Sequence, residues 1–224
     1  MILEPLAKRK TEAKMGNRAV WLAAVDHITY VVSPHTIKRW AWYYTEILGG
    51  KLTKRIDDVD PKGKSSMMLW EIDFGSFAIA LVAGIDRKEK SHITTFWRMH
   101  GDRTVQHVAF RPRGEDLDGL NARLEQYGAR FQGKLLVRQE GDDLVKQIFL
   151  APADEMVNPA ESSFDELQRR PGKDSPITFD ENVAENLYHS AQERMTSGTC
   201  VPMVDWSLMP KDWEPPEPEP EPES

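Results

Sequence analysis

Two histidines occupy the same place in two similar stretches of the sequence. Residues 25–30 are VDHITY and residues 105–110 are VQHVAF, so His27 and His107 are each the third residue of a run rich in β-branched and aromatic residues. Runs of this kind favour β-strands. A symmetric pair of neutral imidazoles would supply two ligands of a metal site. The other histidines have no such counterpart, and we expect structural roles for them: His35, His92, His100 and His189.

Two histidines do not define a metal site, and the sequence offers many carboxylates as a third ligand. The residues alone do not single one out. The segment SFDE at 163–166 has the spacing of a capping box, which favours the start of a helix there.

The similarity between the two stretches extends into a longer repeat. Apolar residues at helical spacing follow each histidine, at 37–48 and at 117–127. Both segments end at a glycine that can adopt the left-handed conformation, Gly49 and Gly128. These glycines lie 79 residues apart and the histidines 80. Two copies of one structural unit explain this agreement.

Strand-like runs follow each predicted helix, so each unit is βαβββ and the fold class is α+β. The expected strands are 51–57, 65–73 and 76–83 in the first unit, and 130–138, 143–150 and about 161–168 in the second. If the units pair about a pseudo-twofold axis, the two histidines meet inside one cavity. The expected organisation is a helical extension at 1–22, a first module at 23–85, a linker with a short helix at 86–103, a second module at 104–170, a helical segment at 171–209 and a disordered tail at 210–224.

Composition excludes several kinds of partner. The net charge is −7, but the Pro/Glu tail EPPEPEPEPES holds five glutamates, so the remainder carries −2 (−7 plus 5). A nearly neutral body without a basic stripe argues against nucleic acid. No apolar run approaches the roughly 20 residues that cross a bilayer, and the N-terminal residues lack the pattern of a signal peptide. The single cysteine, Cys200, excludes an internal disulfide and fits the cytoplasm.

Four segments carry a resemblance to a known family. VDHITYVV, HITTFWRMHGDRTVQHVAF, LVKQIFLAP and SSFDELQRR resemble, in order, segments of the catalytic half of the 4-hydroxyphenylpyruvate dioxygenase and 4-hydroxymandelate synthase family, within the vicinal oxygen chelate superfamily. The match runs with gaps from about residue 22 to residue 195. It implies two βαβββ modules forming a half-open mixed β-barrel, with helices outside.

The resemblance also implies site residues. The two ligand histidines of the family fall on His27 and His107, and a substrate-contacting glutamine falls on Gln147. Counting back from the Gln-Arg pair at 168–169, the ligand carboxylate of the pattern FFEIIQR falls on Asp165. Glu166 competes for this role, but on a strand it faces away from Asp165, so only one of the two can point into the cavity.

The last strand of the first unit could supply a fourth ligand by symmetry, yet its sequence SFAIALV contains no ligating side chain. Its small face, with Ala80 and Val82, is expected to line a substrate pocket, and Phe179 could serve as an aromatic lid. Three protein ligands leave positions open for a substrate and dioxygen, which suits iron(II).

The resemblance therefore implies an iron(II)-dependent dioxygenase with dioxygen as co-substrate, acting on a 2-oxo acid or related small chelating molecule. The family's polar substrate contacts, in a pattern like RIPLNE, are replaced here by AIALVA at 78–83, so the substrate is not expected to be 4-hydroxyphenylpyruvate itself. The alternatives are a metal-dependent lyase or isomerase, a ring-cleaving dioxygenase, and a metal-free binding or resistance protein. The expected partner is a small molecule, and a homodimer is the candidate assembly.

Overall fold

The computed structural model describes residues 21–113, 117–140, 143–151, 159–170, 184–186, 188–189, 191–193 and 205–208. The predicted N-terminal helical extension, all but residues 21 and 22, lies outside these residues, as does the Pro/Glu tail. In the described part, no helix is long and apolar enough to cross a membrane.

The first βαβββ unit forms as predicted. Strand β1 is followed by the short helix α2, which continues as one π-helical segment, η1, and three further strands complete the unit. The helical segment ends before Gly49, whose φ of 75° is the left-handed conformation expected of a glycine at this place. The elements are β1 (Leu22–Val31), α2 (Ile37–Trp42), η1 (Tyr43–Ile47), β2 (Lys51–Ile56), β3 (Ser65–Asp73) and β4 (Ala78–Asp86).

The second unit repeats this order. Gly128, with a φ of 88°, follows its helix as Gly49 follows the first. The first of its later strands is shorter than expected, because residues 130–135 contribute only the isolated bridge of Phe131 with Leu150. The elements are β5 (Thr104–Pro112), α4 (Leu117–Gln126), β6 (Leu136–Glu140), β7 (Asp143–Phe149) and β8 (Phe164–Arg169). Helix α3 (His92–His100) links the units, and short 3-10 turns form η2 (Pro159–Glu161) and η3 (Trp206–Leu208).

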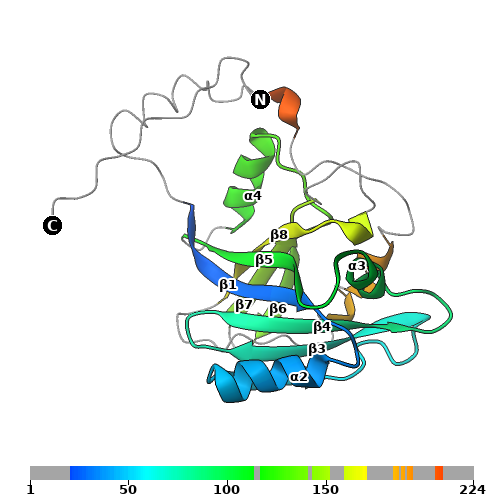
Figure 1. Ribbon diagram of the computed structural model, residues 1–224. Helices are drawn as coiled ribbons and strands as arrows, with labels where there is room; N and C mark the ends of the chain where they lie inside the picture. The colour runs from blue at the N-terminus through cyan, green and yellow to red at the C-terminus, as the bar shows by residue number, and fades with distance from the viewer. Residues whose placement is uncertain are drawn as a thin grey trace.

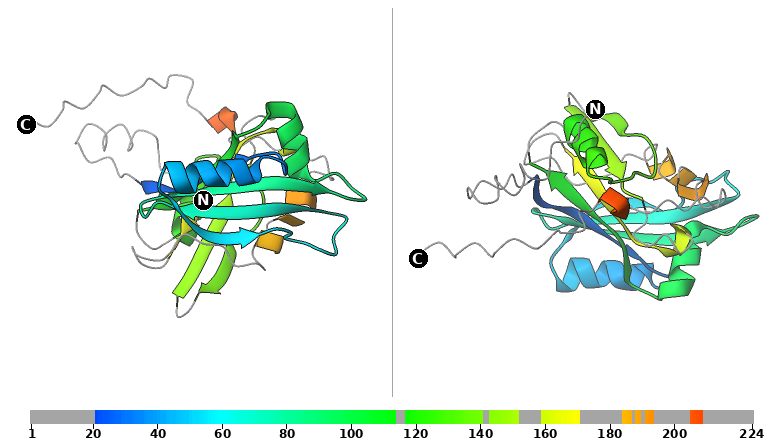
Figure 2. Two further views of the ribbon diagram at one scale, coloured as in Figure 1. Left: turned by 60° about the horizontal axis from the view of Figure 1, so that its bottom comes forward. Right: turned by 90° about the horizontal axis from the view of Figure 1, so that it is seen from above.

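All eight strands form one sheet in the order β2-β3-β4-β1-β5-β8-β7-β6. The central pair, β1 and β5, is antiparallel, while β1 runs parallel to β4 and β5 runs parallel to β8. The order is therefore symmetric about the β1–β5 seam, which is the pairing expected of two equivalent units. The sheet curls into a half-barrel (Figures 1 and 2), so the predicted α+β fold with two βαβββ units is confirmed.

The two helices of the repeat cover the outer face of the sheet. Helix α2 packs through Ile37 and Ala41 on alternate residues of β3 and β4, including Trp70 and Ile79. Helix α4 packs Leu117 on β7 and β8 of the other half. Figure 1 shows the two helices at opposite ends of the molecule. Because both helices lie outside, the inner, concave face is left for other contacts.

The concave face of the first half is covered by α3 and by residues from the predicted C-terminal helical segment. Residues 184–186, 188–189 and 191–193 are helical. Ala184 and Tyr188 pack with Ile93 of α3 against Met67 and Val82 of the sheet.

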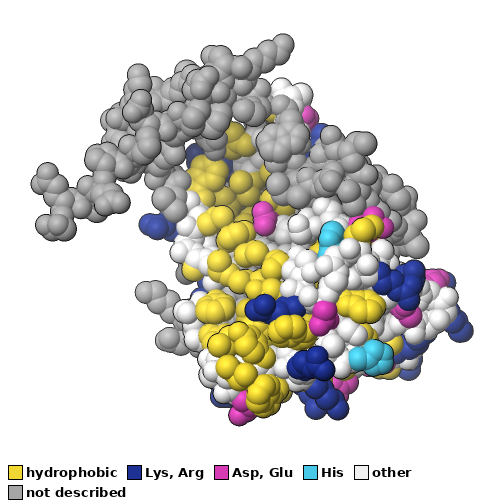
Figure 3. All heavy atoms as spheres, in the orientation of Figure 1, with side chains coloured by type: hydrophobic (Ala, Val, Ile, Leu, Met, Phe, Trp, Pro, Cys, Tyr) yellow, Lys and Arg dark blue, Asp and Glu magenta, His cyan; other side chains and the backbone are white. Residues whose placement is uncertain are grey.

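Exposed apolar side chains gather on the surface near α2, at the lower end of the molecule in Figure 3. Trp42, Ile47 and Leu48 are each about half exposed. The homodimer stays a prediction.

Candidate functional site

The two histidines of the repeat meet across the central seam. In the antiparallel ladder His27 of β1 lies opposite Ala109 of β5, and Thr29 lies opposite His107. The imidazole centroids are 5.6 Å apart, with the rings nearly perpendicular. Strand pairing about the pseudo-twofold axis thus produces the convergence that the sequence repeat predicts.

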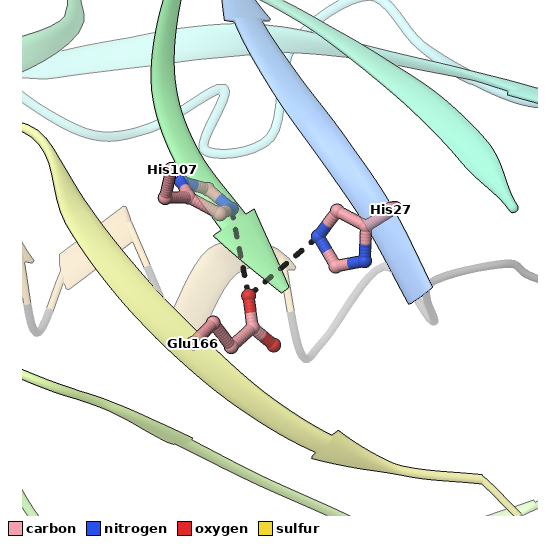
Figure 4. A group of neighbouring side chains, drawn as sticks. All are labelled: His27, His107 and Glu166. Atoms are coloured by element: carbon pink, nitrogen blue, oxygen red, sulfur yellow. Dashed lines mark ion pairs between the residues drawn. The ribbon is translucent and has the colours of Figure 1, made fainter. Parts of the chain in front are cut away.

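A carboxylate from the second half completes a cluster of three side chains. Glu166 Oε2 lies 3.6 Å from His27 Nε2 and 3.4 Å from His107 Nε2 (Figure 4). The three candidate ligand atoms all lie within 4.8 Å of one another. His27 and Glu166 are buried, and His107 is partly buried at the edge of the cavity.

Asp165 is the residue expected at this position, and the structure brings Glu166 there instead. Residues 164–169 form a strand, so Asp165 and Glu166 point to opposite faces. Asp165 shares its face with Leu167, which packs on Leu117 of α4. The pKa of Asp165 is raised because that face is partly desolvated.

The expectation of Asp165 beside the histidines follows from how the pattern was aligned. Counting back from the Gln-Arg pair at 168–169 assumed that the carboxylate comes three positions before the glutamine. In the structure Gln168 is only two residues after Glu166, so both side chains lie on the same face and both are buried. The chain is one residue shorter here than the pattern.

A buried carboxylate holds His27 from behind. The imidazole Nδ1 donates to Asp26 Oδ1 at 2.9 Å. Asp26 also accepts from Arg111 Nε at 2.8 Å and from Arg170 Nε at 3.1 Å. Burial alone would raise the pKa of Asp26, but the hydrogen bond with His27 and the two guanidinium groups outweigh it and hold the pKa well below the usual range. With the proton fixed on Nδ1, His27 Nε2 faces Glu166.

His107 is held more weakly. Its Nδ1 faces Gln106 Oε1 at 3.3 Å, so the proton lies on Nδ1 and Nε2 accepts from the Thr29 hydroxyl at 2.8 Å. Burial lowers the pKa of His107 well below its ordinary value, and the neighbouring His27 lowers it further. Burial also lowers the pKa of His27, although Asp26 opposes the shift. Both imidazoles are therefore neutral near pH 7, the form that binds metal.

Two glutamines fix the other oxygen of Glu166. Gln147 Nε2 donates to Oε1 at 3.2 Å. With its amide nitrogen turned toward Glu166, Gln168 donates to the same oxygen at 2.9 Å and accepts from Arg170 Nη2 at 2.8 Å. Gln147 thus orients the carboxylate, and its predicted contact with substrate stays a prediction.

The position that corresponds to Glu166 in the first half carries no side chain that could bind a metal. In the first half His27 pairs with Ala78 of β4, and Ala80 comes two residues later on that strand. In the second half His107 pairs with Phe164 of β8, and Glu166 comes two residues later. Ala80 is therefore the counterpart of Glu166. Its methyl group leaves space beside the cluster.

The cluster opens into a pocket whose empty space, including its mouth, is about 580 Å³. Ala80 and Val82 line it, as the sequence analysis expected, whereas Phe179 lies outside the described residues. His92, expected to have a structural role, also lines it. The other lining residues are Thr29, Met67, Leu69, Ile93, Gln106, His107, Gln132, Phe149, Phe164, Glu166, Ala184, Tyr188 and Ala191.

Some of these residues were not found from the sequence. The alternation of Met67 and Leu69 on their strand was visible, but it did not indicate which face is concave. Asp26 directly precedes His27, yet its partner Arg170 is 144 residues away in the sequence. Tyr188 reaches the pocket only because a segment beyond the second module folds back over the first.

The sequence matches no protein-family model, and no curated protein matches it. Solved structures do match. A triple variant of 4-hydroxymandelate synthase from Streptomyces coelicolor superimposes with a TM-score of 0.60 and 15% identity over 80% of this chain. The chain spans 58% of the length of that synthase. A methylmalonyl-CoA epimerase from Mycobacterium tuberculosis matches with a TM-score of 0.47 and 22% identity, over 69% of this chain and 93% of its own.

The half-barrel of paired βαβββ units, together with the likeness to the synthase, shows that this chain has the vicinal oxygen chelate fold. The predicted fold is thereby confirmed. At these identities the likeness concerns the fold alone.

Proposed function

We propose that this chain is an iron(II)-dependent dioxygenase that acts on a 2-oxo acid or a related small chelating substrate, with His27, His107 and Glu166 as the metal ligands. The observation that carries the proposal is the convergence of two neutral imidazoles and one carboxylate on a common point at the wall of a pocket.

The donor set fits iron(II). Two imidazole nitrogens and one carboxylate form the facial triad of non-haem iron oxygenases, which leaves positions for a bidentate substrate and dioxygen. When bound, iron(II) would supply the activation of dioxygen. The alanine at position 80, where symmetry allows a fourth ligand, favours an open site of this kind.

The surrounding residues prepare the three ligands. Asp26 keeps the His27 proton on Nδ1, and Gln147 binds Glu166 Oε1, so that Oε2 stays directed at the histidines. Because these groups are held before anything binds, little ordering accompanies metal uptake.

The pocket also favours an acid that chelates the metal. Among its described lining residues there is no lysine or arginine. The carboxylate of a substrate buried in this pocket needs a compensating positive charge, and a cation held by the three proposed ligands would provide it. A 2-oxo acid that chelates this cation would be bound without a lysine or an arginine in the pocket.

A metal titration under anaerobic conditions tests the ligand assignment. The wild-type protein should bind one iron(II) per chain. Glu166→Gln should weaken binding at least about 100-fold, since loss of an outer-shell partner alone costs about 10–100-fold. Asp165→Asn is the matched control on the next residue, and its iron affinity should equal that of the wild type.

Oxygen consumption with a panel of 2-oxo acids and catechols then tests the reaction. Consumption with a 2-oxo acid supports the proposal, and consumption with catechols alone indicates ring cleavage. Tight binding of another divalent ion without any oxygen use indicates a lyase or isomerase. If Asp165→Asn lost the metal while Glu166→Gln kept it, the ligand assignment would be wrong, and if no metal bound, a metal-free binding protein would be the better description.

A further inference from the structure

The pocket is sharply divided into a ligand-bearing end and an apolar end. From this division we infer that the substrate carries an uncharged, apolar tail with no polar group at its tip, such as a branched alkyl chain or an unsubstituted phenyl ring. The inference rests on the proposed function, because it assumes that the acid end of the substrate is held at the three-residue cluster.

The ligand-bearing end lies against the seam, where Thr29, His107 and Glu166 line the pocket. The apolar end lies over the first half of the sheet. Its floor comes from β3 and β4, and its cover from α3 and the helical residues of 184–193. The side chains of this end are Met67, Leu69, Ala80, Val82, Ile93, Ala184 and Ala191, together with the rings of His92 and Tyr188.

Each of the two covering rings has a polar atom engaged by a protein partner. The Tyr188 hydroxyl donates to Ser65 Oγ at 2.6 Å. His92 Nδ1 lies 3.2 Å from Gln192 Oε1, which also accepts from the His92 backbone N–H at 3.0 Å. The rings stack with centroids 5.0 Å apart. Both rings therefore contribute surface to the cover, while the Tyr188 hydroxyl and His92 Nδ1 bind within the protein.

The polar side chains of the opposite wall belong to the second half. Gln106 accepts from His107, and Gln132 is held by its backbone against Phe149 of β7. Among the described residues that line the pocket, Glu166 is the only aspartate, glutamate, lysine or arginine. A second carboxylate or an ammonium group on the tail would meet no lysine, arginine, aspartate or glutamate among the described side chains of the apolar end.

A hydroxyl at the tip of the tail would also be penalised. An unpaired buried polar group weakens binding by about 5–150-fold. Phenylpyruvate and 4-hydroxyphenylpyruvate differ by one such hydroxyl. We expect the anaerobic iron(II)-loaded protein to bind phenylpyruvate at least about tenfold more tightly, as measured by calorimetry. 4-Methyl-2-oxopentanoate should likewise bind more tightly than 2-oxoglutarate.

Two neighbouring methionines provide a matched pair of variants. Met67 lines the pocket, whereas Met68 points to the other face of β3 and packs in the core under α2. Glutamine has nearly the shape of methionine but carries an amide. Met67→Gln should reduce the preference for phenylpyruvate to about threefold or less. Met68→Gln should leave the preference unchanged.

Val82→Thr is a second variant, which adds one hydroxyl to the floor with almost no change in volume. It should reduce the same preference in the same direction, and circular dichroism verifies that each variant is folded. An equal or tighter affinity for 4-hydroxyphenylpyruvate would overturn the inference, as would a preference that both floor variants leave intact.

Repeating the titrations on metal-free protein separates this inference from the proposed function. If iron(II) strengthens 2-oxo acid binding but the tail makes no difference, only the inference about the tail fails. If apolar tails are preferred but iron(II) adds nothing to the affinity, the chelating function fails while the apolar end keeps its role.

Discussion

The two halves of the sheet are built on one plan, yet they treat equivalent positions differently. His27 and His107 correspond, but His27 is backed by the carboxylate of Asp26 and His107 by the amide of Gln106. On the parallel neighbour strand, at the position where we propose a carboxylate ligand, the second half has Glu166 and the first half has Ala80.

This difference explains how a symmetric fold produces an asymmetric site. Four equivalent ligand positions would surround a metal with protein groups. Because one of the four positions carries the methyl group of Ala80, the first half contributes space and apolar surface to the pocket. The second half contributes the carboxylate of Glu166. Variants that make equivalent positions of the two halves more alike, or more different, test this division of roles between the halves.

Ala80→Glu should have the largest effect, because it gives the first half the ligand that it lacks. We expect metal affinity to rise at least about tenfold, as even an outer-shell partner is worth that much, and 2-oxo acid binding to be lost. The metal-free variant should melt at a lower temperature than the wild type, because the new carboxylate is buried beside Glu166.

Ala80→Leu is the control, since it fills the same space without an oxygen. It should reduce 2-oxo acid binding without strengthening metal binding. Equal metal affinities for the two variants would mean that residue 80 does not face the metal.

Asp26→Asn should have the next largest effect, because it makes the support of His27 resemble that of His107. Metal affinity should fall about 10–100-fold. The loss of a buried charge that neutralises Arg170 should also lower the free energy of unfolding by about 3–5 kcal/mol. Competition with a chelator measures the first quantity, and urea denaturation the second.

Gln106→Leu is the parallel change in the second half. Its effect on metal affinity should be smaller, because the contact that it removes is a long, neutral hydrogen bond. A larger loss in Gln106→Leu than in Asp26→Asn would reverse the comparison.

Thr29→Val should have the smallest effect. Thr29 donates to His107 Nε2, the atom that faces Glu166, while its counterpart Ala109 has no hydroxyl to offer His27. A metal must displace this hydrogen bond, which is worth about 1 kcal/mol, so its removal should tighten metal binding by about fivefold. The same chelator competition measures it, and weaker binding would mean that Thr29 helps to hold the bound state.

The sequence repeat was sufficient to predict the fold and the meeting of the two histidines, because both follow from symmetry. The carboxylate that lies beside the two histidines is Glu166, one residue after the expected Asp165. On a strand such an error exchanges the two faces, and neither Asp165 nor Glu166 shows by its type which one points inward. The apolar end was predicted only for Ala80 and Val82, because Tyr188 and His92 reach it through contacts between distant segments.

The β1–β5 ladder is the only one that joins the two halves within the described sheet. His27 stands on one side of this junction, and His107 and Glu166 stand on the other. An ion bound to all three would crosslink the two halves, and its binding free energy would add to the free energy of unfolding. The reaction and the stability of the contact between the two halves would then depend on the same ion.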